Sequence, residues 1–125
     1  MDFGEWLLGE IEKSGLSYSE IGRRSGFSHA RISQIVNGDK PSADFCIAIS
    51  RALNLSPMLV LRRAGLIPQK SAGDEELEEF LFYYDNLPAE LRRNLRLTAK
   101  ALVRELRDEY RTDEDEDLAP GPSPA

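Results

Sequence analysis

The chain has 125 residues, 41% of them hydrophobic, and a formal net charge of −6, which predicts one modest domain or one domain with an accessory element. No apolar run approaches the ~18 residues of a membrane span, and the acidic, amphipathic start MDFGEWLLGE does not resemble a signal peptide. The single cysteine, Cys46, can form no internal disulfide and is expected to be a small buried hydrophobic residue. These features favour a reducing, intracellular location.

The negative charge is concentrated in the second half of the chain. Residues 1–70 carry a net charge of +2 and residues 71–125 carry −8. The whole-chain charge therefore does not exclude a nucleic-acid partner, because binding depends on a local basic face.

A first helix is expected from Asp2 to Lys13, ended by Gly15. Its apolar residues recur at helical spacing and form a core face: Phe3, Trp6, Leu7 and Ile11. We interpret Trp6 as a core aromatic residue rather than a residue that stacks on a ligand.

The segment SYSEIGRRSGFSHARISQIVNG, residues 17–38, predicts two short helices joined by a tight turn. Ser17 is a suitable N-cap, and Glu20 stands three residues later, the spacing of a capping box. Gly26 suits the left-handed residue that ends the first helix. Ser28 is expected to cap the second helix, which extends to about Gly38.

The second of these helices has one apolar stripe and one polar ridge. Ile32 and Ile35 are expected to face Ile21 and the small Gly22 of the first helix, as in a helix-turn-helix. The opposite side is a ridge that a DNA major groove can accept, formed by His29, Ala30, Arg31, Ser33 and Gln34.

Two further short helices follow, from Ser42 through Leu53 and from Ser56-Pro57 to about Ala64. The apolar stripe of the first consists of Phe45, Ala48, Ile49, Ala52 and Leu53. Five short helices over about 65 residues predict a compact all-α domain.

Residues 3–66, about half of the chain, resemble the DNA-binding domain of the Cro and phage-repressor (Xre-type) family. The matching residues are Ile21, Gly22, Gly26, Phe27, Ser28, Ile32, Ser33, Ile35 and Asn37-Gly38, with the segments PSADFCIAISRALNLSP and LRRAGLIP. Tyr18 stands where the family often has glutamine, and Val36 where an acidic residue is common. The resemblance implies a five-helix lambda-repressor-like DNA-binding domain over residues 1–67.

The resemblance also implies which residues touch DNA. The second helix of the motif, residues 28–37, would lie in the major groove, with base readout by His29, Ala30, Arg31, Ser33 and Gln34. Phosphates would be held by Ser17, Tyr18, Arg23, Ser28, Asn37 and Lys40.

Residues 68–73 have the composition of a linker, and residues 74–111 predict two amphipathic helices that form a hairpin. Two such helices bury too little to be stable alone, so they pack either on residues 1–66 or, as we prefer, on a second copy. The expected dimerisation residues are Leu77, Phe80, Leu81, Tyr84, Leu91, Leu95, Leu102 and Leu106.

Residues 112–125 are acidic and then rich in proline, which predicts a disordered tail. Such a tail can serve solubility alone. Alternatively, Asp113, Glu114, Asp115, Glu116 and Asp117 weaken binding to non-specific DNA.

No catalytic arrangement is visible in the sequence. The only histidine, His29, has no partner at metal-ligand or triad spacing, and no Gly-rich phosphate loop exists. We therefore expect no enzyme, no metal and no cofactor.

The leading hypothesis is a cytoplasmic, nucleoid-associated transcriptional regulator, a repressor that binds double-stranded DNA as a homodimer at an inverted repeat. The alternative is an antitoxin-type or other protein-interaction module, whose C-terminal helices bind a toxin or an antagonist protein.

Overall fold

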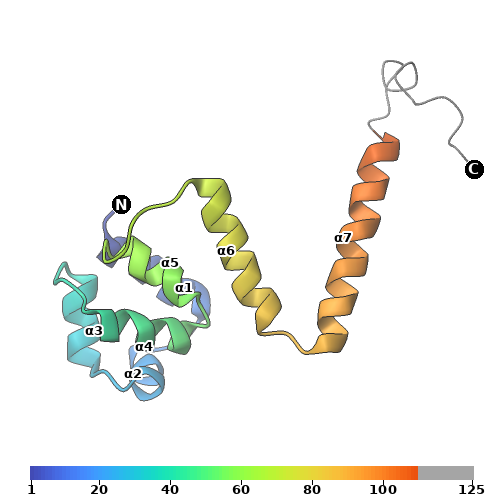
Figure 1. The fold of residues 1–125 in the computed structure, drawn as a ribbon. Helices are drawn as coiled ribbons and strands as arrows, with labels where there is room; N and C mark the ends of the chain where they lie inside the picture. Colours follow the sequence, from blue (N-terminus) through green and yellow to red (C-terminus); the bar gives the residue numbers. More distant parts are fainter. Residues whose placement is uncertain (110–125) are drawn as a thin grey trace, which may run out of the picture. The chain divides into compact units, whose positions relative to one another are not determined.

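The computed structural model describes residues 1–109, which form seven helices and no strand (Figure 1). The helices are α1 Phe3–Ser14, α2 Tyr18–Ser25, α3 His29–Val36, α4 Ala43–Leu53, α5 Pro57–Arg63, α6 Ala72–Asp85 and α7 Ala89–Glu109. The all-α prediction is confirmed for this part of the chain. Two compact units are present, Met1–Asp85 and a second that begins at Asn86, and each is described separately below.

Helices α1 to α5 begin at the side-chain caps expected from the sequence. In each case a side-chain oxygen accepts the N–H of the residue three positions later, and the caps are Asp2, Ser17, Ser28, Ser42 and Ser56. Gly26 ends α2 with φ 79°, in the left-handed region that a side chain would disfavour. The ends of these short helices are therefore set by residues close in sequence.

The core lies where α1, α2, α3, α4 and α5 meet. Its fully or almost fully buried side chains are Leu7, Ile11, Ile21, Ile32, Ile35, Phe45, Cys46, Ile49, Ala52, Leu53 and Val60. Phe3, Trp6 and Phe27 pack at its edge, with the Phe27 ring edge-on to Phe45 at 5.1 Å between centroids. Burial raises the pKa of the Cys46 thiol to about 11, as expected for a structural cysteine.

Gly4 is where α1 crosses closest to the C-terminal end of α3. A Cβ on Gly4 would lie 2.3 Å from the carbonyl oxygen of Val36, far inside van der Waals contact. Gly22 has a similar role at the turn between α2 and α3, where a Cβ would lie 2.8 Å from the Phe27 carbonyl oxygen. Small residues at both positions set the distance of α3 from its neighbours.

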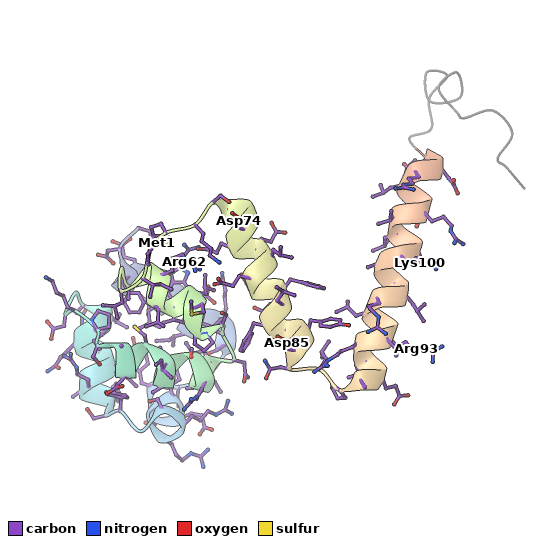
Figure 2. All side chains as sticks on the ribbon, in the orientation of Figure 1. Met1, Arg62, Asp74, Asp85, Arg93 and Lys100 are labelled. Atoms are coloured by element: carbon purple, nitrogen blue, oxygen red, sulfur yellow. The ribbon has the colours of Figure 1, made fainter. Side chains whose placement is uncertain are left out.

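Helix α6 belongs to the first unit and forms ion pairs with the end of α5. Arg62 at the end of α5 has a side chain that is 1% exposed, and Figure 2 labels it near the start of α6. Its Nη1 donates to Glu78 Oε1 at 2.8 Å and its Nη2 to Glu78 Oε2 at 3.2 Å, while Nε donates to the Pro68 carbonyl at 3.1 Å. The hydrogen bond from Arg62, with one from Lys70, lowers the pKa of Glu78 to about 2.

The apolar stripe of α6 faces away from this attachment. Leu77, Phe80 and Leu81 are 58%, 45% and 49% exposed, whereas Glu75 and Glu78 are half-buried. The helix begins at Ala72, so the last two residues of the expected linker, 72–73, are helical. Of the two alternatives, α6 does fold back on the first unit, but through its acidic side.

The second unit contains α7, which has no buried residue. Leu91, Leu102 and Leu106 are each about half exposed. The expected hairpin, residues 74–111, is thus divided between two units, with α6 in one and α7 in the other. Residues 110–111 and the expected tail, residues 112–125, lie outside the described residues.

Candidate nucleic-acid interface

The two hydroxyls expected to hold phosphates cap the helices of the motif. Ser17 Oγ accepts the Glu20 N–H at 3.1 Å, and Ser28 Oγ accepts the Arg31 N–H at 3.0 Å. Each hydroxyl keeps its own O–H as a donor. A phosphate at either helix start would therefore meet a hydroxyl donor together with the unpaired amides of the first turn.

Helix α3 has a buried side and an exposed side. Ile32 and Ile35 are fully buried, as the sequence predicted. Of the five expected base-reading residues, His29, Ala30 and Gln34 are exposed. The other two, Arg31 and Ser33, are half-buried and hydrogen-bonded within the protein.

His29 is held by an aromatic neighbour. The Tyr18 and His29 rings meet edge to face, with 5.0 Å between centroids. Tyr18 also packs at the edge of the core, so its ring is fixed from the other side. The tyrosine that replaces the family's frequent glutamine thus connects the start of α2 to the start of α3.

Arg31 is bound to the loop that follows α3. Its Nη1 donates to Gln34 Oε1 at 3.3 Å and to Asp39 Oδ2 at 3.2 Å, and its Nη2 donates to the Lys40 carbonyl at 3.4 Å. Ser33 lies beside Asn37, whose Nδ2 donates to Ser33 Oγ at 3.4 Å.

The remaining charged groups give this segment a modest positive field. Residues 17–40 hold four Lys or Arg side chains and two acidic ones. Arg23 and Arg24 both pair with Glu20, and these hydrogen bonds lower the Glu20 pKa. Lys40 is exposed at the end of the loop. The cations lie where a polyanion can reach them.

Within residues 1–109, no group of His, Cys, Asp and Glu has an arrangement that could hold a metal ion. The same part of the chain contains no helix long and apolar enough to cross a membrane.

Comparison with known families identifies the motif. Residues 10–60 match the helix-turn-helix family model, which covers the end of α1 through most of α5. This segment is a helix-turn-helix domain of the Cro and phage-repressor (Xre) type. The two helices of the motif are α2 and α3, each with a side-chain cap, and α3 carries the exposed ridge.

Curated relatives carry the same domain. An uncharacterised HTH-type transcriptional regulator of Mycobacterium tuberculosis, found in two strains, is 34% identical over 65 residues, which are 51% of this chain and 46% of the relative. The chain therefore spans about half the length of the curated relatives that it matches. No solved structure matches it significantly.

Two features of this chain were missed by the sequence reasoning. The buried Arg62 follows Leu59 by three residues and lies on the core side of α5, so its helical position was a usable signal. The pairing of Arg31 with Asp39 spans eight residues and a turn, and no local pattern indicates it.

Proposed function

We propose that this protein is a sequence-specific DNA-binding transcriptional regulator that places α3 in the major groove. The observation that carries the proposal is the exposed ridge of His29, Ala30 and Gln34 on a helix fixed by two fully buried isoleucines. Direct base readout needs a rigidly held helix whose outer face presents hydrogen-bonding groups and small apolar groups to the base edges. The similarity of residues 10–60 to helix-turn-helix domains supports the same assignment.

Each exposed side chain has a chemically suitable target. The Ala30 methyl group can contact a thymine methyl, His29 can donate to a guanine acceptor, and the Gln34 amide can bond a base edge. Ser17, Ser28, Asn37 and Lys40 lie at the helix starts and the loop, where phosphates would fix the register. Tyr18 and Arg23 complete the expected set.

The division of the chain that we propose assigns DNA binding to residues 1–67 and self-association to residues 74–111. The exposed apolar side chains of α6 and α7 support a homodimer, because a soluble monomer seldom leaves so many in water. The dimer would act as a repressor at an inverted repeat, with half-site centres about 34 Å apart.

The same exposed leucines also suit an antitoxin-type module that binds another protein. Co-purification separates the two functions. A module of that kind carries a small partner protein through purification, whereas the regulator purifies alone and self-associates.

The test is selection of binding sites from random double-stranded DNA, run with the full chain and two variants. Gln34→Ala should cost about 1–3 kcal/mol on the preferred site and weaken the preference at one base position. Lys40→Ala should weaken good and poor sites alike and reduce the salt slope by about one unit.

Arg51→Ala is the charge-matched control, because this exposed cation lies in the last turn of α4, far from the loop at residue 40. It should leave both affinity and preference unchanged. Failure of the wild-type protein to enrich any motif refutes the proposed function.

A further inference from the structure

Arg31 is less available to DNA than its position in the motif implies. Its side chain is 37% exposed, compared with 76% for Arg23 on the preceding helix. Its guanidinium already donates to three acceptors, one on α3 and two in the loop after it. These hydrogen bonds use three of the five N–H donors of the guanidinium and tie it to the loop, which limits how far it can reach toward a base.

The same contacts determine how Gln34 is presented. A guanidinium has only donors, so the atom of the Gln34 amide that faces it is the oxygen. The amide nitrogen of Gln34, with its two N–H donors, is then the group left to meet DNA. The same Nη1 also donates to Asp39 Oδ2 at 3.2 Å. The Arg31 side chain is therefore bonded to the loop and to Gln34 at the same time.

We propose that Arg31 is a specificity-determining positioning residue, which acts on base readout through Gln34 and does not itself contact a base. This inference rests on the proposed function, since it requires α3 to read DNA. Asp39 has a supporting role, because its carboxylate accepts a hydrogen bond from the Arg31 guanidinium and fixes its position.

The inference predicts the base that Gln34 selects. A side chain that presents N–H donors suits the acceptors of guanine, adenine or thymine, whereas cytosine offers only its N4 donor in the major groove. On the DNA strand that Gln34 contacts, cytosine should therefore be the base most strongly rejected. Without Arg31 the amide can rotate and present its oxygen, and cytosine should become tolerated.

The experiment compares Arg31→Ala and Asp39→Ala with the wild-type chain by binding-site selection, with a melting curve for each variant. Both variants should reduce the discrimination against cytosine at the Gln34 position, on the order of 2- to 10-fold, the value of one hydrogen bond. Asp39→Ala removes a negative charge, so its affinity for random DNA should rise while its base preference broadens. Arg24→Ala is the matched control, because it removes one paired cation from α2 and should leave every base preference intact.

A double-variant cycle decides whether Arg31 acts through Gln34. In the Gln34→Ala background, Arg31→Ala should cause no further change in preference at that position. A change at a different base position would mean that Arg31 reads a base itself, and a uniform loss of affinity with a smaller salt slope would mean that it holds a phosphate. Either result overturns the inference, as does an unchanged selection profile for Arg31→Ala. If Gln34→Ala alters the wild-type motif in those same experiments, the proposed function stands while the positioning role fails.

Discussion

Substitution of Gly4 by alanine tests whether the contact between α1 and α3 is as close as the structure places it. The added Cβ would lie 2.3 Å from the Val36 carbonyl oxygen and 2.9 Å from that of Ile35, whereas ordinary contact begins near 3.4 Å. Both atoms belong to backbone, which cannot rotate away as a side chain can. The two helices would have to separate by about 1 Å in this region.

The magnitude follows from two opposing contributions. Overpacking a close contact costs about 1–3 kcal/mol. Replacing glycine by alanine within a helix stabilises the folded state by up to about 1 kcal/mol, because alanine has the higher helix propensity. A Cβ added to Gly9 on the same helix would meet no neighbouring atom within 4 Å. Gly9→Ala should therefore gain helix propensity without any overpacking.

The assay is urea unfolding of the full chain followed by circular dichroism, with Gly9→Ala as the matched control. Gly4→Ala should be the less stable of the two by about 1–3 kcal/mol, or about 4–8 °C in melting temperature for each kcal/mol. Its affinity for the selected DNA site should also fall, because Val36 ends the helix that carries Gln34. Equal stability of the two variants would refute the close crossing of α1 and α3.

Two further predictions concern α6. The pKa of the Glu78 carboxyl is lowered from 4.5 to about 2. The stabilisation by ionised Glu78 is therefore complete above pH 4.5 and is lost as the pH falls toward 2. Glu78→Gln should remove this part of the acid dependence, measured by amide exchange in α6, and an unchanged acid profile would contradict the Arg62 pairing. If the proposed homodimer forms through α6 and α7, Leu81→Asp should convert it to a monomer in sedimentation, whereas Leu66→Asp, at a leucine of similar exposure outside these helices, should not. A dimer that persists in Leu81→Asp at the same concentration places the interface elsewhere.

The first five helices could be predicted from the sequence because their signals are local. A serine or aspartate cap, a left-handed glycine and an apolar repeat each act within a few residues, as at Ser28, Gly26 and the pair Ile32 and Ile35. The exposed ridge of α3 followed from the same repeat, since residues opposite a buried stripe face solvent.

The orientation of α6 could not be predicted in this way. Hydrophobic periodicity assumes that apolar residues face the protein and charges face water, and it selected the stripe of Leu77 and Leu81 as the contact side. The side of α6 that meets the first unit instead carries Glu78, which pairs with Arg62, a buried cation 16 residues earlier. A pairing across that separation leaves no periodic trace in either helix.

The role of Arg31 was hidden for a related reason. Its place on α3 predicts an exposed residue, and only the path of the loop brings Asp39 within 3.2 Å of it. The sequence identified the exposed residues of α3, but it could not show that Arg31 is bonded to the loop that follows this helix.

The bidentate pairing of Arg62 with Glu78 has a consequence for the rotation of α6 about its own axis. Apolar contacts are not directional, whereas two parallel N–H···O bonds fix the angle at which the carboxylate points. Leu77 and Leu81, on the opposite side of α6, therefore have a fixed direction relative to α3. A chain with methionine at position 62 and leucine at position 78 would keep a similar stability, since such replacements of buried ion pairs are often neutral. It would lose the fixed angle of α6, and the proposed homodimer would then accept DNA half-sites over a wider range of spacings.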